Sequence, residues 1–168
     1  YGSERSVMIG RDVAVLKSVL SDGPWDYVAL GHIHKHQDLN EGRYPAMVYP
    51  GSLERIDFGE EKEPKGFCWV ELDKGATTWR FVPVKARRFI TINTDVREED
   101  DPTMAVQAVI AQHDVSNAIV RVNVRLRPEQ DASLREKDVR AALRDADFVA
   151  AVNRQADRDV RERLGGLS

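Results

Sequence analysis

The sequence predicts an α+β protein in two parts, because the order of its strands and helices changes part of the way along the chain. Residues 1–86 have mixed short strands and one helix, which is typical of part of an α/β sheet domain. From residue 87 the order becomes strand, helix, strand, helix, strand, which is typical of a compact βαβαβ unit with its own core. We therefore predict two domains, 1–86 and 87–168.

The first part contains a helix, two short strands and a hairpin. "RDVAVLKSVLSDG" has helical spacing of apolar residues and ends on Gly23. "YVALG" (27–31) is continuously apolar, as in a strand covered on both faces, and "AMVYPGS" (46–52) is a second strand that ends in a Pro-Gly turn. "GFCWVELDKGATTWRFVPV" predicts a hairpin with strands at 67–72 and 77–84.

The second part begins with the strand "RFITINTDV" and ends with the strand "DFVAAVNRQ" and a charged helical tail, "DRDVRERLGG". Asp101 and Pro102 predict an N-cap followed by proline at the first helical position. Ser133 and Glu136 have the spacing of a capping box for a second helix.

The strand "AIVRVNVRLR" between these helices alternates cleanly. Val120, Val122, Val124 and Leu126 point to one side, and the other side carries Arg121, Asn123, Arg125 and Arg127. If helices cover the apolar side, the arginine side is either a solvated outer face or a surface for DNA phosphates. We predict Arg121, Arg125 and Arg127 as DNA-binding residues and keep the solvated face as the alternative.

Composition restricts the function classes. A chain of 168 residues that is 42% hydrophobic can bury a core, and its net charge of −3 leaves nucleic-acid binding to a local basic face. Cys68 is the single cysteine, which rules out an internal disulfide and fits a reducing compartment. No apolar run is long enough to span a bilayer, and the first residues lack the layout of a signal peptide. We expect a cytoplasmic protein without membrane association.

Histidines follow the first apolar strand at every second position. In open α/β sheets ligand sites gather beyond the carboxyl ends of strands, and Gly31 lets the backbone turn sharply there. If the segment stays extended, His32 and His34 project to the same side and suit Mn²⁺, Fe²⁺ or Zn²⁺. Two ligands do not complete a metal site, so a polar loop with solvated histidines is the alternative. We expect His36 to be a supporting or solvated residue, with a third metal ligand or a proton shuttle as the alternative, and the Gln37 amide to brace the loop by hydrogen bonds.

Two segments carry a resemblance to a known family: "DYVALGHIHKHQ" and "YPGSLERIDFGEEKEPKGFCWVEL". Together they resemble the later part of the calcineurin-like metallophosphoesterase domain, most closely that of bacterial SbcD nucleases of the SbcCD exonuclease and their Mre-type double-strand-break-repair relatives. "SERSVMIGRDVAV" resembles the linker between the fourth and fifth metal motifs of those proteins. The resemblance implies that 1–86 are the C-terminal segment of a metallophosphoesterase (nuclease) α/β sandwich. It also implies that 87–168 are a DNA-binding capping domain with a short charged tail.

The resemblance further implies a chemistry. In that family two Mn²⁺ ions lie side by side, with other divalent metals possible, and His32 and His34 would each bind one of them. The intact protein would be a DNA exonuclease and endonuclease in double-strand-break repair, a homodimer working with an SMC-like ATPase subunit of the SbcC/Rad type. The upstream metal motifs are absent here, so we expect the isolated chain to be inactive. The alternatives are a noncatalytic DNA- or partner-binding fragment and a calcineurin-like phosphodiesterase for small substrates.

Three further residues have both a functional and a plain interpretation. Gly51 and Ser52 sit where the family's loop approaches the metals, so they could donate to a phosphate, but a tight turn explains them equally well. The Arg55 guanidinium could fork onto phosphate oxygens. The alternative for Arg55 is a salt bridge with one of three nearby carboxylates, those of Glu54, Asp57 and Glu60.

Overall fold

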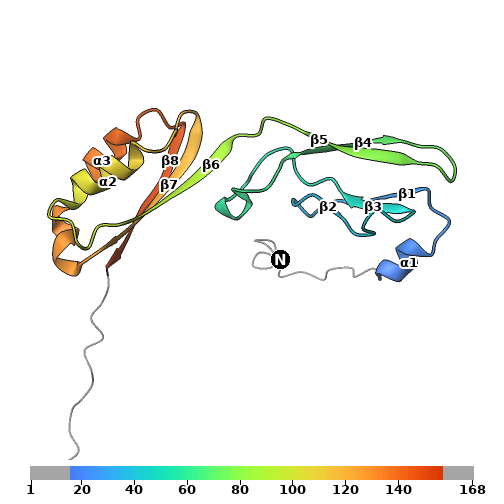
Figure 1. Cartoon of the computed structure of the whole chain (residues 1–168), viewed down its shortest axis with the longest axis horizontal. Coiled ribbons are helices and arrows are strands. Elements are labelled where there is room, and N and C mark those ends of the chain that lie inside the picture. The colour runs from blue at the N-terminus through green and yellow to red at the C-terminus, as the bar shows by residue number, and fades with distance from the viewer. Residues whose placement is uncertain (1–15, 157–168) are drawn as a thin grey trace, which may run out of the picture. The chain divides into compact units, whose positions relative to one another are not determined.

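The computed structural model describes residues 16–156, which mix helices and strands, so the predicted α+β class is confirmed. The chain divides into two compact units, Tyr1–Phe89 and Ile90–Ser168 (Figure 1). Only the end of the first predicted helix is described, as α1 (Lys17–Ser21). The rest of that helix, the linker-like segment and nearly all of the charged tail lie outside the described residues. Within them, no helix is both long and apolar enough to cross a membrane.

A three-stranded sheet forms the centre of the first unit. Its strands are β1 (Tyr27–Ala29), β2 (Gln37–Asp38) and β3 (Ala46–Tyr49), in the order β1-β3-β2. β3 is parallel to β1 and antiparallel to β2, and its Met47 and Val48 are fully buried. The prediction that 27–31 is a strand covered on both faces is wrong: β1 lies at the edge of this sheet and is only half-buried, with Ala29 exposed. The second short strand, β3, takes the central place instead.

The predicted hairpin is confirmed as β4 (Gly66–Glu71) and β5 (Thr78–Pro83), which pair antiparallel (Figure 1). Its strands alternate, so that Phe67 and Trp69 are exposed while Trp79 and Phe81 are half-buried. The half-buried aromatic rings contact His36, in the histidine segment between β1 and β2. The hairpin therefore packs against the histidine segment at His36.

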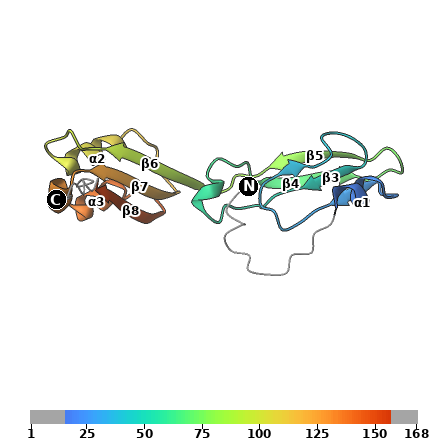
Figure 2. The ribbon, with the colours of Figure 1, turned by 90° about the horizontal axis from the view of Figure 1, so that it is seen from below.

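The second unit is a three-stranded sheet with two helices on one face (Figure 2). Its strands are β6 (Arg88–Asp95), β7 (Ala118–Leu126) and β8 (Phe148–Ala156), in that spatial order, and β7 runs parallel to β8. The helices are α2 (Pro102–Ile110) and α3 (Glu136–Ala142). A 3₁₀ helix, η3 (Pro128–Ser133), lies between β7 and α3.

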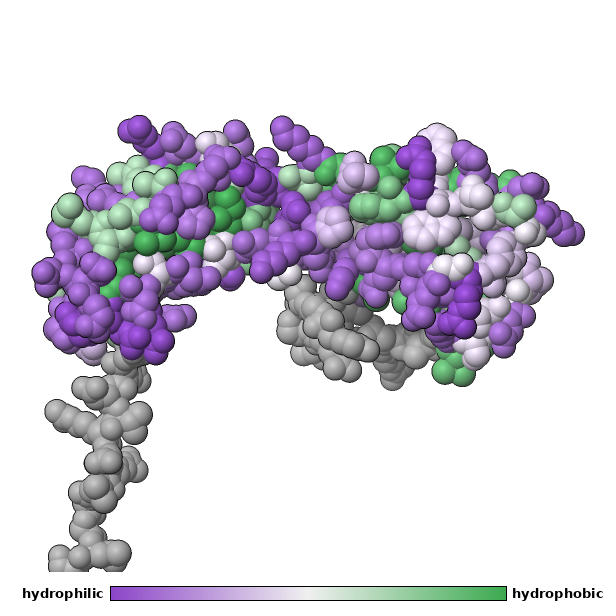
Figure 3. Space-filling model, viewed as in Figure 1, coloured by the Kyte–Doolittle hydropathy of each residue, from purple (hydrophilic) through white to green (hydrophobic). Residues whose placement is uncertain are grey.

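The core of the second unit is built on β7, where the predicted alternation is confirmed. All four predicted core residues of this strand are completely buried: Val120, Val122, Val124 and Leu126. They pack with Val106 and Ile110 of α2 and with Val139 and Leu143 of the α3 segment. Each such side chain stabilises the unit by about 1.5–3 kcal/mol relative to exposure to water. The face shown in Figure 3 is mainly hydrophilic, with hydrophobic areas on both units.

One helix start agrees with the sequence and the other does not. Asp101 caps α2 as predicted, because its carboxylate accepts from the backbone N–H groups of Thr103 and Met104 at 2.9 and 3.1 Å. The capping box predicted at Ser133 is wrong, since Arg135 is the N-cap of α3 and makes no side-chain capping bond. Ser133 is instead the last residue of η3. Pro128 starts that turn with a suitable fixed φ, and the chain reaches helical geometry only later.

Candidate functional site

The histidine segment links β1 to β2 and is not extended at its first histidine. His32 has φ +80° and is exposed, so the alternation that would place His32 and His34 on the same side does not hold. A Cβ atom added to Gly31 would meet nothing within 4 Å, and Gly31 is not among the residues with positive φ. The unusual backbone therefore lies one residue later than the glycine.

The Pro-Gly-Ser turn after β3 lies directly against this segment. Gly51 has φ +85°, and a Cβ atom there would lie 2.7 Å from the carbonyl oxygen of His34. Glycine is required at this position because both the backbone conformation and the close approach exclude a side chain. The backbone N–H of Ser52 donates to the same His34 carbonyl at 3.0 Å. The turn thus holds the main chain of His34 in place.

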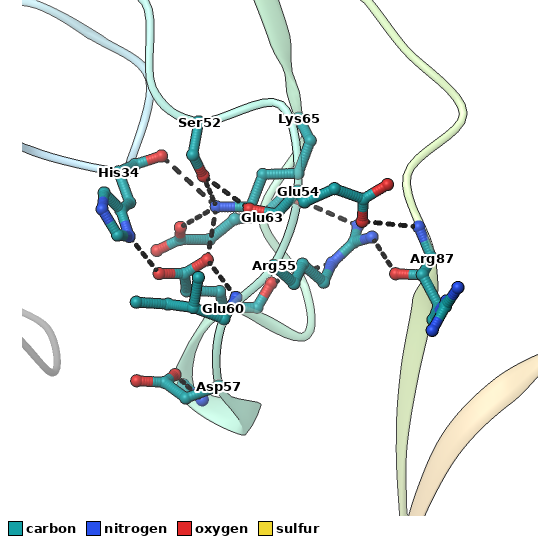
Figure 4. A network of polar contacts seen from close by, with 11 residues as sticks. His34, Ser52, Glu54, Arg55, Asp57, Glu60, Glu63, Lys65 and Arg87 are labelled. Atoms are coloured by element: carbon teal, nitrogen blue, oxygen red, sulfur yellow. Dashed lines mark hydrogen bonds and ion pairs between the residues drawn. The ribbon is translucent and has the colours of Figure 1, made fainter. Parts of the chain in front are cut away.

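The side chain of His34 contacts a buried ion pair (Figure 4). Its Nδ1 lies 2.9 Å from Oε1 of Glu60, whose other oxygen lies 2.7 Å from Nζ of Lys65. The Glu60 side chain is 3% exposed and that of Lys65 is fully buried, whereas His34 is 32% exposed. The half-buried imidazole therefore contacts a carboxylate that is almost completely buried.

Lys65 connects the segments that meet at this point. Besides Glu60, its ammonium contacts the His34 carbonyl at 3.3 Å, Ser52 Oγ at 2.9 Å and Glu63 Oε2 at 3.3 Å (Figure 4). A buried ammonium is tolerated only with such a full set of acceptors. Lys65 thereby ties the histidine segment, the Gly51 turn and the loop before β4 together.

Glu60 remains ionised in spite of its burial. Burial alone would raise its pKa, but hydrogen bonds from Lys65 and His34, with a further one from the backbone N–H of Ile56, outweigh it. The net result is a pKa below the usual value for a glutamate. The site therefore holds a fixed negative charge between an imidazole and an ammonium.

Arg55 does not form the salt bridge that was its alternative interpretation among the described residues. Nε donates to the Glu60 carbonyl at 3.1 Å, Nη1 to the Arg87 carbonyl at 2.8 Å and Nη2 to the Glu63 carbonyl at 2.8 Å (Figure 4). The guanidinium thus bonds to backbone carbonyls rather than to a carboxylate. These bonds use three of the five N–H groups of the guanidinium, so the phosphate contact of Arg55 stays a prediction. The Ser52 hydroxyl is also engaged, because it donates to the Glu54 carbonyl at 2.7 Å.

His36 packs where the sheet meets the hairpin. Its ring stacks on Phe81 with 4.2 Å between the ring centroids and meets Trp79 edge-on at 5.8 Å. Its Nδ1 lies 2.9 Å from the carbonyl oxygen of Tyr49. Gln37 follows in β2, directly opposite Tyr49. The two residues therefore support the loop by packing and strand pairing.

The second unit presents a polar row on the face of β7 opposite its core. Asn123 donates to Asn93 of β6 and accepts from Asn153 of β8, both at 2.8 Å. Arg121 donates to Thr91 of β6 at 3.0 Å. These contacts order the polar side chains across all three strands of the sheet.

The three predicted arginines do not share one environment. Arg121 and Arg125 lie on the polar face of β7, where Arg125 is exposed. Arg127 lies beyond the end of the strand, is the N-cap of η3, and pairs with Glu129 at 3.0 Å. The predicted arginine row thus contains two residues in the strand and one in the turn after it.

Glu60 and Lys65 are the site residues that sequence reasoning missed. They belong to the charged stretch "GEEKEPK", where nothing local separates a buried ion pair from a solvated charge run. Over residues 16–156, no cluster of three or more histidine, cysteine, aspartate or glutamate side chains is arranged to hold a metal ion. The described part of the chain therefore contains no closed metal site, and metal binding by His32 and His34 stays a prediction.

Comparison with known proteins finds a similarity over part of the chain. No family model matches the sequence. The chain is similar to the SbcD component of the SbcCD nuclease of Staphylococcus saprophyticus, with 34% identity over 90 residues. The matched region covers 54% of this chain and 23% of that relative, so the similarity concerns a limited part of the relative.

Proposed function

We propose that this chain is part of a metal-dependent DNA nuclease of the SbcD type, which acts in double-strand-break repair by two-metal phosphodiester hydrolysis. The observation that carries the proposal is His34, which follows a β-strand and rests on a buried carboxylate. Histidine ligands in metal sites commonly have such a carboxylate behind them. The similarity to the SbcD component of an SbcCD nuclease supports the same proposal.

His32 and His34 would each hold one ion of a Mn²⁺ pair, and the remaining ligands would come from outside the described residues. When bound, the metals would activate water and stabilise negative charge on the phosphodiester. The Gly51 turn and Lys65 keep the His34 backbone in position. The first unit would then be the C-terminal segment of a metallophosphoesterase sandwich.

The second unit would be a capping domain that binds DNA through the open face of its sheet. Arg121 and Arg125 supply positive charge there, and amide groups such as that of Asn123 can donate to phosphate oxygens. The intact nuclease would work in the cytoplasm as a homodimer with an SMC-like ATPase partner of the SbcC/Rad type. These assignments rest on the family resemblance together with the charge of this face.

The test is Mn²⁺-dependent nuclease activity of the full-length protein. His32→Ala or His34→Ala should abolish degradation of linear duplex DNA, since each change removes a ligand from a different metal. His113→Ala is the matched control, because His113 is exposed and lies in the other unit. Normal turnover by His32→Ala or His34→Ala would refute the two-metal assignment.

A further inference from the structure

We infer that Glu60 is a positioning residue that selects the tautomer of His34. Glu60 holds the imidazole proton on Nδ1, so that the lone pair of Nε2 is presented to a metal. The inference rests on the proposed function for the identity of the ligand, but the tautomer itself is a property of the metal-free chain. It begins from the 2.9 Å contact between Nδ1 and Oε1 of Glu60.

Glu60 can only accept a hydrogen bond. Its carboxylate is ionised, because Lys65 and the backbone N–H of Ile56 both donate to Oε2, at 2.7 and 3.3 Å. A carboxylate without a proton has no hydrogen to donate to a ring nitrogen. Nδ1 must therefore be the protonated nitrogen of a neutral His34, which leaves Nε2 as the nitrogen with a lone pair.

The orientation of the carboxylate is enforced from its far side. Lys65 is completely buried, and its ammonium has donors only. It also contacts the His34 carbonyl and Ser52 Oγ, so it cannot move away without breaking the contacts around the Gly51 turn. The Lys65 ammonium thus keeps one oxygen of Glu60 toward itself and the other toward His34.

This arrangement predicts an unusual result for Glu60→Gln, a change that hardly alters the size of the side chain. Lys65 and the Ile56 N–H both donate, so the amide oxygen must take the place of Oε2. The amide NH₂ must then face Nδ1 of His34 and donate to it. The substitution should therefore move the imidazole proton to Nε2, the nitrogen that would bind the metal.

The experiment is ¹⁵N NMR of the 168-residue chain with labelled histidine, without metal and at a pH where the imidazoles are neutral. His34→Ala assigns the His34 signals. The native chain should show a protonated Nδ1 and an unprotonated Nε2 at His34, and Glu60→Gln should exchange the two. If Glu60 had only a structural role, Glu60→Gln would not change which nitrogen of His34 carries the proton. An Nε2–H tautomer in the native chain overturns the inference without any variant, so the test survives even if Glu60→Gln fails to fold.

Glu63→Gln is the matched control, because Glu63 also contacts Lys65, while no dashed line joins it to the His34 ring in Figure 4. Glu63→Gln should leave the His34 tautomer unchanged. If the proton of His34 moved to Nε2 in this variant, the Lys65 ammonium alone would determine the tautomer, and the role of Glu60 would be overturned. In the full-length protein Glu60→Gln should weaken Mn²⁺ binding by roughly 10–100-fold.

The two proposals can fail separately. An unchanged tautomer in Glu60→Gln, with activity lost in His34→Ala, rejects the positioning role and keeps the nuclease. An exchanged tautomer, with full activity in His34→Ala, keeps the positioning role and rejects the metal assignment.

Discussion

At the scale of single residues, His34 and His36 show how surroundings decide what a histidine does. Both lie in the segment between β1 and β2, two positions apart. His34 contacts a buried carboxylate, whereas His36 contacts a main-chain carbonyl and stacks on Phe81. A carboxylate orders an imidazole for ligand binding, while an aromatic stack uses the ring as a packing surface. Identical residue types thus make different contacts because different elements pack against them.

Tyr27 should ionise only at high pH, which should make the stability of the first unit sensitive to alkali. Burial, with Cys68 as a neighbour, raises the pKa of Tyr27 from 10.0 to about 12. The folded state keeps the phenol proton that the unfolded state loses, so the contribution of Tyr27 to stability is unchanged below pH 10 and is lost as the pH rises toward 12. The check is the difference in alkaline absorbance titration between the native chain and Tyr27→Phe, with urea unfolding over the same pH range. Ionisation of Tyr27 near pH 10 would contradict the expectation.

At the scale of elements, β7 determines both faces of the second unit. Its alternating side chains supply the buried centre of the core on one side and a polar row on the other. The alternation has a period of two because successive residues of a strand point to opposite faces. The strand therefore carries two separate predictions, one for stability and one for binding.

Leu126→Ala should destabilise the second unit by about 2–5 kcal/mol, because the fully buried side chain would leave a cavity. Met104→Ala is the control, since Met104 is 65% exposed on α2 in the same unit. Its effect should stay within about 0.5 kcal/mol. Urea unfolding followed by circular dichroism measures both. Equal effects of the two changes would show that the core is not centred on β7.

Replacing Arg121 and Arg125 together by alanine should weaken binding to DNA of any sequence. Two lost phosphate contacts should reduce the slope of log affinity against log salt by roughly two. The matched control is Arg135→Ala with Arg140→Ala, which removes the same charge from residues paired with Asp138 and Glu136. Fluorescence anisotropy with a labelled duplex at several salt concentrations gives both slopes. If the two double variants have equal slopes, the β7 face is a solvated surface.

Arg127→Ala tests whether DNA contacts the strand β7 or the turn after it. Arg127 lies in the turn after the strand, whereas Arg125 is exposed on the polar face of β7, so removal of Arg127 should change the affinity less than the loss of Arg125 does. The same anisotropy measurement compares the two single variants with the β7 pair. A larger loss of affinity in Arg127→Ala than in Arg125→Ala would place the DNA contact on the turn.

At the scale of the whole molecule, the chain should hydrolyse no phosphodiester. Two-metal catalysis needs both ions held as a fixed pair, and residues 16–156 contain no cluster of three ligand side chains. A lone imidazole binds Mn²⁺ weakly, because Mn²⁺ lies at the low end of the divalent affinity order. Incubation of the purified chain with Mn²⁺ and with single- and double-stranded DNA is the measurement. Turnover that disappears in His34→Ala would show a complete site in this chain.

The sequence by itself determined the elements whose cause is local. The alternation of β7, the hairpin of β4 and β5 and the Asp101 cap each depend on residues close together in the chain. Local patterns can also mislead: the spacing of Ser133 and Glu136 indicated a cap, but a 3₁₀ turn occupies that place. Likewise, apolar runs predicted two strands without showing which one lies at the centre of the sheet.

Only the tertiary structure decided what surrounds His34. Glu60 and Lys65 lie 26 and 31 residues further along the chain, and the folding of intervening loops brings them to the imidazole. Whether a charged residue meets water or a buried partner depends on how those loops close, which no local periodicity encodes. The same reason applies to Arg55, whose guanidinium donates to three carbonyls on segments that meet only after folding. The histidines of the site were thus visible in the sequence, but their pairing was a property of the fold.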